Sequence, residues 1–267
     1  MKITRSETKL HDEAEDLLKL SRELSEDEQE FIYRNWNPMA NHNVGKGGIF
    51  FTPVALAEEY ANYAGGGSIT HYIDLCAGIG MLTWAVQKHD RNPNAVYVCL
   101  EINHDFVEIG KKLCPWAYWY EGSIFDIELL KRINKEHGPF HYAFSNPPFG
   151  NIPTSGDEWL KTNGGFHWKA IEIAVRMAIG GMFILPDQYC DYDLKENKYR
   201  DPLPSVKFLP KFPGIYLAPV SLDMSMIENV DWKGTNPHVA FIDIMTDDVT
   251  WQRPFGLGEV VKQDSLF

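Results

Sequence analysis

The chain has 267 residues, 44% of them hydrophobic, and a formal net charge of −12. This length can bury a full core, as one large domain or as one domain with a lobe. The charge argues against a surface coated for phosphate backbones, although a basic cleft on an acidic body is compatible with it. No apolar run is long enough to span a bilayer, and the charged N-terminal segment MKITRSETKLHDEAEDLLKL lacks the apolar part of a signal peptide.

The cysteine pattern points to a protein without disulfides or a metal site. The four cysteines are Cys76, Cys99, Cys114 and Cys190, and they show no CxxC or other metal-ligand spacing. Cys76 and Cys99 sit in or beside apolar, strand-like runs. We therefore expect them to be reduced core residues of a cytoplasmic protein that has no membrane contact.

The N-terminal part of the chain reads as helical. Leucines and Ala14 recur near helical spacing over residues 8–36, and SEDE at 25–28 is a capping box that restarts a helix. A loop rich in Asn and Gly follows at 37–48. Pro53 then opens an amphipathic helix over 54–64, which the glycines at 65–67 end.

From residue 69 onward, strands and helices alternate, which is typical of a parallel sheet covered on both faces. The predicted strands are 69–75, 95–101, 117–122, 140–145 and 180–186, and the predicted helices are 80–90, 104–113, 127–136 and 168–178. Two further apolar runs, 214–222 and 238–245, are close enough in sequence to form an antiparallel edge. Ligands of such sheets bind at the carboxyl ends of the strands.

A glycine turn follows the first predicted strand, in the run Asp74-Leu-Cys-Ala-Gly78-Ile-Gly80. Glycines let the backbone turn sharply and approach a ligand closely, although many strand-to-helix turns carry them for steric reasons alone. A dinucleotide-binding fingerprint would have glycine at position 83, where this chain has Thr83, which argues against NAD. The position of Asp74 suits a ligand with a cationic amino group.

Acidic residues also follow the next two strands. Glu101 is placed to accept both ribose hydroxyls of an adenosine, although a single strand-end Glu is more often a surface charge. Asp126, in GSIFD, could accept a hydrogen bond from the adenine amine, or could simply cap a helix. Ile102, Ile124 and Phe125 offer apolar faces to the adenine ring.

The fourth strand runs into SNPPFG at 145–150. Two adjacent prolines exclude a helix and hold the preceding residues extended, so the motif is at least a turn that ends a strand.

Five motifs in order, GIFFTP (48–53), DLCAGIG (74–80), CLEIN (99–103), GSIFD (122–126) and SNPPFG (145–150), resemble those of the S-adenosylmethionine-dependent amino-methyltransferases. The sequence most resembles the N6-adenine class, in the motif order of the gamma subgroup. The resemblance implies an α/β Rossmann-like methyltransferase fold, with a mostly parallel, doubly wound sheet and an antiparallel edge strand. We expect a helical extension at 1–47 and a catalytic domain at 48–267.

The resemblance also implies roles for the motif residues. Asn146 and the carbonyl of Pro147 would each accept one N–H of an adenine amine, Pro148 would help to stiffen the loop, and Phe149 would stack on a flipped-out base. Phe51 and Thr52 would close over the methionine end of the cofactor; a helix N-cap at Thr52 with a buried phenylalanine is the alternative. The expected cofactor-binding residues are Phe51, Thr52, Asp74, Gly78, Gly80, Glu101, Ile102, Phe125 and Asp126.

The sequence departs from the DNA-methyltransferase pattern in one respect, because no full target-recognition domain follows the core. The insert at 187–213 interleaves lysines and aromatic residues, but its net charge is zero, so an ordinary surface loop is favoured over a substrate-contacting loop. The loop at 150–167 flanks the catalytic motif and could wrap the target base. A protein partner could supply target recognition.

The leading hypothesis is methyl transfer from S-adenosylmethionine to the N6 amine of adenine in DNA, with little or loose sequence specificity. The same chemistry could act on RNA or on a protein glutamine amide, since the Asn-Pro-Pro motif serves all of these acceptors. Phe149 favours a nucleobase, because tyrosine is common at that position in the glutamine class. The third hypothesis is a cofactor-binding subunit or decoy without activity.

Overall fold

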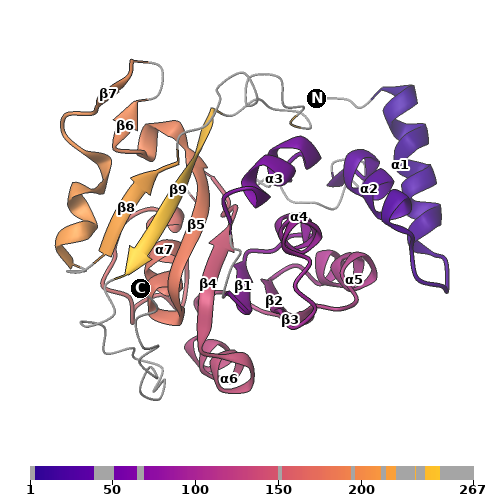
Figure 1. The fold of residues 1–267 in the computed structure, drawn as a ribbon, viewed down its shortest axis with the longest axis horizontal. Helices are drawn as coiled ribbons and strands as arrows, with labels where there is room; N and C mark the ends of the chain where they lie inside the picture. Colours follow the sequence, from indigo (N-terminus) through magenta and orange to yellow (C-terminus); the bar gives the residue numbers. More distant parts are fainter. Residues whose placement is uncertain are drawn as a thin grey trace.

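The computed structural model describes residues 4–38, 51–64, 69–149, 152–193, 196–211, 215–220, 232 and 238–246. These residues contain a seven-stranded sheet. Its strands are β1 (His71–Leu75), β2 (Val96–Glu101), β3 (Tyr118–Glu121), β4 (Phe140–Ser145), β5 (Ala178–Pro186), β8 (Ile215–Pro219) and β9 (Val239–Thr246). They lie in the order β3-β2-β1-β4-β5-β9-β8 (Figure 1).

Helices cover both faces of this sheet, as the sequence predicts. They are α1 (Arg5–Leu18), α2 (Glu26–Asn35), α3 (Val54–Ala61), α4 (Met81–Asp90), α5 (His104–Leu113), α6 (Ile127–His137) and α7 (Phe166–Met177). The helices α1 to α5 share one hydrophobic cluster, and α6 and α7 belong to a second. Within the described part of the chain, no helix is long and apolar enough to cross a membrane.

The strands β3, β2, β1, β4 and β5 are parallel, and β9 runs antiparallel to both β5 and β8. The predicted antiparallel edge is therefore confirmed, with β8 outermost and β9 inserted between β8 and β5. The burial of the strands accounts for this order. Phe241 and Ile242, adjacent in β9, are both buried, whereas Tyr216 in β8 is 58% exposed.

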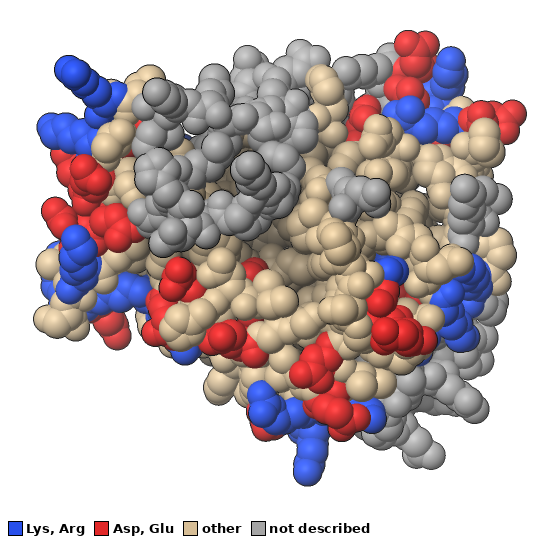
Figure 2. Space-filling model, turned by 180° about the vertical axis from the view of Figure 1, so that it is seen from behind, with Lys and Arg blue, Asp and Glu red and all other residues tan. Residues whose placement is uncertain are grey.

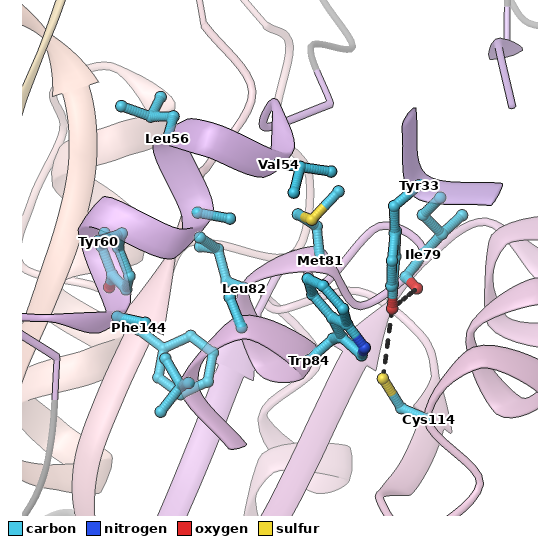
Figure 3. Packing of buried hydrophobic residues seen from close by; sticks show 14 of the residues in the cluster. Tyr33, Val54, Leu56, Tyr60, Ile79, Met81, Leu82, Trp84, Cys114 and Phe144 are labelled. Carbon is cyan, nitrogen blue, oxygen red and sulfur yellow. Dashed lines mark hydrogen bonds between the residues drawn. The ribbon is translucent and has the colours of Figure 1, made fainter. Parts of the chain in front are cut away.

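Successive residues of a strand point to opposite faces, and this separates the two hydrophobic clusters. Tyr72 of β1 belongs to the cluster under α3 to α5, and the next residue, Ile73, belongs to the cluster under α6 and α7. On the first face, Tyr60 of α3 packs near Leu82 of α4 and Phe144 of β4 (Figure 3). The contact fixes α3 against the centre of the sheet.

The two N-terminal helices begin at capping boxes, at Thr4 for α1 and at Ser25 for α2. The restart of the helix predicted at 25–28 is thus confirmed. The hydroxyl of Tyr33 in α2 donates to the carbonyl of Ile79 at 3.3 Å and lies 3.4 Å from the Cys114 sulfur (Figure 3). These contacts attach α2 directly to the glycine turn. Two predictions fall on residues that the structure does not describe. They are the part of the loop at 37–48 that begins at residue 39, and the glycines at 65–67 that are expected to end a helix.

The insert after β5 is more ordered than a simple surface loop. It contains η2 (Asp187–Tyr189), β6 (Tyr192–Asp193), β7 (Lys198–Tyr199), η3 (Pro204–Lys207) and η4 (Leu209–Lys211). Arg200 pairs with Asp187 at 3.6 Å and with Asp193 at 3.1 Å, and the buried Phe208 stacks on Trp168 of α7. The insert therefore packs on α7. The division of the chain at residue 47 stays a prediction.

A buried carboxylate in α7 holds the loop before that helix. Glu172 is fully buried and accepts the backbone N–H groups of Lys161 at 2.8 Å and Thr162 at 2.7 Å. It also accepts from the guanidinium of Arg176, which is itself buried. One carboxylate thus satisfies two loop amides and one buried cation.

We predict that Glu172→Gln lowers the free energy of unfolding by about 3 kcal/mol, because it leaves a buried guanidinium without its counter-ion. Urea unfolding measures the change. Glu158→Gln, in the same loop but exposed, should stay within about 0.5 kcal/mol of the wild type. Equal effects of the two substitutions would contradict the structural role of Glu172.

Candidate functional site

A cavity of about 380 Å³ opens at the carboxyl ends of β1, β2 and β4. It lies at the switch point of the sheet, where β1 has β2 on one side and β4 on the other. A volume of this size suits a small-molecule cofactor. Ten residues that the sequence predicts for the site line it, namely Phe51, Thr52, Asp74, Gly78, Glu101, Ile102, Ile124, Phe125, Asn146 and Pro148.

The glycine turn after β1 needs its glycines for two different reasons. Gly78 has φ +57°, lines the cavity, and leaves room for the Phe51 ring, which would lie 3.3 Å from an added Cβ. Gly80 has φ +88° at the start of α4, and a Cβ there would lie 3.0 Å from the Trp119 ring. Gly80 is not among the cavity-lining residues, so its position reflects packing.

Cys76, in the same turn, differs from the expectation of a core residue. It adopts φ +64° and lines the cavity with a partly exposed side chain. Cys99 is buried as predicted, and both cysteines are free thiols. Cys76 still packs against the hydrophobic cluster under α6 and α7, so it lies at the border between the core and the cavity.

Asp74, one residue before the end of β1, is a buried carboxylate that is only 1% exposed. Its Oδ2 accepts the hydroxyl of Thr83 at 2.8 Å, while Oδ1 has no hydrogen-bond partner among the described residues. Burial raises the pKa of this carboxyl well above its usual range. A cationic amino group placed in the cavity would satisfy Oδ1 and favour the ionised form. Thr83, the residue that argued against a dinucleotide fingerprint, is what holds Asp74.

Glu101 connects the ends of two strands. Its Oε2 accepts the backbone N–H of Gly78 at 2.8 Å, and its Oε1 accepts that of Asn103 at 2.9 Å. Burial raises the pKa of this carboxyl, and the surrounding backbone N–H groups oppose that shift. Each carboxylate oxygen has two lone pairs, so both can accept further hydrogen bonds from ligand hydroxyls.

Apolar side chains form the wall beyond Glu101. Ile102 is 69% exposed, whereas Ile124 and Phe125 are buried, and all three line the cavity. The Phe125 ring meets Phe166 of α7 edge-on, with centroids 5.2 Å apart. Such a wall can receive a flat heterocycle.

Asp126 lies outside the cavity lining. Its Oδ1 accepts the backbone N–H groups of Glu128 and Leu129 at 3.1 Å each, so the side chain caps α6, as the alternative interpretation expects. Ser123 in the same loop does line the cavity, and sequence reasoning missed it. A contact between Asp126 and an adenine amine stays a prediction.

The Asn-Pro-Pro-Phe motif leaves the end of β4 beside β1. The hydroxyl of Ser145, just before it, donates to the carbonyl of Leu75. Asn146 and Pro148 line the cavity, Pro147 is buried, and Phe149 packs against the hydrophobic cluster under α3 to α5. The stacking role of Phe149 stays a prediction.

The segment before α3 reaches the same cavity. The helix is capped at Pro53 without a side-chain hydrogen bond, so the alternative of a Thr52 cap is wrong. Instead, Thr52 Oγ1 accepts from Asn146 Nδ2 at 2.9 Å. The Phe51 ring packs edge-on against Trp36 and Phe106, at centroid distances of 5.7 and 5.1 Å. The N-terminal helices thus support one wall of the cavity.

The loop after the motif supplies wall residues that no sequence motif marks. Ile152, Pro153, Thr154 and Ser155 line the cavity. Side chains on either side hold this loop in place. Lys169 of α7 binds the Thr154 hydroxyl at 2.6 Å and the carboxylate of Asp157, and Trp159 Nε1 donates to the Phe125 carbonyl at 2.9 Å.

No protein-family model and no curated protein matches the sequence. Solved structures do match in fold. A methyltransferase subunit of a type I restriction-modification system from Streptococcus thermophilus is 13% identical, with a TM-score of 0.57 over 85% of this chain and 51% of that chain. A modification subunit from Vibrio vulnificus is 11% identical, with a TM-score of 0.54 over 84% of this chain and 50% of that chain.

The M protein of the type I restriction enzyme EcoKI is 10% identical, with a TM-score of 0.51 over 91% of this chain and 55% of that chain. The chain therefore spans about half the length of these neighbours. The likeness confirms the predicted Rossmann-like methyltransferase fold.

The burial of Asp74 makes stability depend on pH in the unliganded protein. The folded state holds this proton more tightly than the unfolded state, so the free energy of unfolding falls as pH rises from about 4 through the raised pKa. In Asp74→Asn the side chain does not ionise, so its free energy of unfolding does not fall in this way. We predict that the free energy of unfolding of Asp74→Asn, minus that of the wild type, increases with pH above about 4, as measured by urea unfolding.

Asp12→Asn, at an exposed position in α1, serves as the control and should follow the wild type. A stability difference between Asp74→Asn and the wild type that stays constant or shrinks with rising pH would contradict a raised pKa.

Proposed function

We propose that this protein transfers a methyl group from S-adenosylmethionine to the exocyclic N6 amine of adenine in DNA, with little or loose sequence specificity. The observation that carries the proposal is the cavity lining. The glycine turn, the carboxylates of Asp74 and Glu101, and the Asn-Pro-Pro motif through Asn146 all border one space. The fold shared with methyltransferase subunits of restriction systems supports it.

The hydrogen-bond acceptors and apolar walls of the cavity fit S-adenosylmethionine. Asp74 Oδ1 is a buried acceptor suited to the ammonium of the methionine part, and Glu101 is suited to the ribose hydroxyls. Ile102 and Phe125 would hold the adenine ring. When bound, this cofactor supplies an electrophilic methyl group on its sulfonium sulfur. The carboxyl group of Asp74 would ionise beside the ammonium, and the attraction between the two charges would offset the cost of burying the carboxylate.

The acceptor chemistry rests on the motif at the end of β4. The exocyclic amine of adenine is a poor nucleophile, because its lone pair is delocalised into the ring. Asn146 Oδ1 and the Pro147 carbonyl would each accept one N–H, which favours the pyramidal nitrogen of the transition state. Pro147 and Pro148 restrict the backbone, so these acceptors do not reorganise during the reaction. Phe149 would stack on the flipped base.

A protein partner is expected to provide target recognition. Lys and Arg lie toward the periphery of the face in Figure 2, interspersed with Asp and Glu. In the insert after β5, Arg200 is paired with Asp187 and Asp193, and Lys211 binds the carbonyl of Lys161 and the Asn163 side chain. Charges engaged in this way contribute little to binding a phosphate backbone. The restriction-system neighbours are likewise subunits of larger enzymes.

We predict that incubation with cofactor labelled in its methyl group transfers label to unmethylated DNA, and that the label appears as N6-methyladenine after digestion to nucleosides and mass analysis. Asn146→Ala should lower this transfer by at least 100-fold, because it removes one acceptor of the developing charge. Calorimetric cofactor affinity of that variant should stay nearly unchanged.

Asn163→Ala, in the exposed loop before α7, is the matched control and should retain transfer. Label in RNA or in protein glutamine would move the proposal to another acceptor. Cofactor binding without transfer to any polymer would indicate a non-catalytic subunit, and retained transfer by Asn146→Ala would refute the role of Asn146.

A further inference from the structure

One hydrogen bond joins the segment before α3 to the catalytic motif, 94 residues further along the chain. Asn146 Nδ2 donates to Thr52 Oγ1 at 2.9 Å. Both side chains line the cavity, and Thr52 is only 5% exposed. Because both side chains face the cavity, their contact can determine how they are oriented toward a bound ligand.

The position of Thr52 is fixed by the core. The residue directly precedes α3, whose Tyr60 donates its hydroxyl to the carbonyl of Met182 in β5 at 2.5 Å and packs on Phe144 of β4. The helix is thereby attached to the same strand, β4, that leads into Asn146 (Figure 3). Thr52 and Asn146 are held by one rigid frame, in which the amide nitrogen of Asn146, and not its oxygen, faces the Thr52 hydroxyl.

The amide of Asn146 needs such a partner. The last torsion of an asparagine side chain is broad and roughly two-fold, because the flat amide has nearly the same shape after a half turn. Packing alone therefore does not decide whether oxygen or nitrogen faces a ligand. An adenine amine offers N–H groups, and only the amide oxygen can accept from them. With Nδ2 directed to Thr52, Oδ1 points away from Thr52.

We propose that Thr52 is a positioning residue for the amine acceptor, which acts by fixing the orientation of the Asn146 amide. The inference rests on the proposed function for its catalytic consequence, while the contact itself can be measured separately. It gives Thr52 a task beyond closing over the cofactor. Losing the Thr52 hydroxyl should impair turnover more than cofactor binding.

The first test measures the amide directly and needs no methyl transfer. The side-chain NH₂ signals of Asn146 are identified in the NMR spectrum by their loss in Asn146→Ala. In Thr52→Val, which is nearly isosteric but has no hydroxyl, their hydrogen exchange should become at least tenfold faster, and in Thr52→Ser it should stay close to the wild type. Unchanged exchange in Thr52→Val would overturn the proposal.

The second test is kinetic. Thr52→Val should lower kcat by about 10- to 100-fold through misplacement of the acceptor, with the cofactor Kd within about threefold of the wild type, and Thr52→Ser should recover most of the turnover. Thr8→Val, on the exposed face of α1, is the control. Thr52→Ala replaces the valine variant if the latter does not fold. If the weaker cofactor binding of Thr52→Val accounted for its whole loss of methyl-transfer activity, the proposal would be overturned.

The two tests separate this inference from the proposed function. If the wild type methylates no DNA but hydrogen exchange of the Asn146 amide depends on the Thr52 hydroxyl, the proposed function fails and the positioning contact stands. If DNA is methylated but neither exchange nor kcat responds to Thr52→Val, the positioning role fails and the proposed function stands.

Discussion

The hydrogen bonds that Glu101 accepts from Gly78 and Asn103 hold the site together, because they join the loops that follow two neighbouring strands. A parallel sheet leaves the carboxyl ends of its strands without further ladder bonds, so each loop there needs another partner. Glu101 is that partner for the glycine turn, and Ser145 extends the connection by donating to Leu75 in β1. Three strand ends thereby form one rigid edge, on which the cavity is built.

The chemistry of this edge depends on groups that are costly to bury without a ligand. Asp74 is buried, one of its oxygens has no hydrogen-bond partner among the described residues, and burial raises its pKa. A cationic ligand group would stabilise the ionised carboxylate and satisfy that oxygen. Asn146 also lines the cavity and donates to Thr52, just before α3. The same cavity is thus bordered by a carboxylate suited to a cationic group and by the amide of Asn146.

The sequence predicted the elements well because hydrophobic periodicity is local. The predicted bounds of β4 and α5 coincide with those observed, and α7 begins two residues earlier than predicted. The insertion of β9 between β5 and β8 was not predictable, because it depends on pairing between distant segments. The same limit applies to the site. Motif spacing identified the glycine turn, Glu101 and Asn146. Ser123 lies within the GSIFD motif, but the motif does not show which of its residues face the cavity, and the position of the loop at 152–155 depends on contacts with distant segments. Asp126 caps a helix, as aspartate often does at that position.

The central claim is that the cavity binds S-adenosylmethionine, and calorimetric titration of the purified protein tests it most directly. We predict a single site with micromolar affinity and no heat from NAD. The affinity should be at least tenfold weaker in Glu101→Gln, where a carboxylate oxygen that accepts from the strand-end loops is replaced by an NH₂ group. No binding of S-adenosylmethionine, or equal binding of NAD, would contradict it.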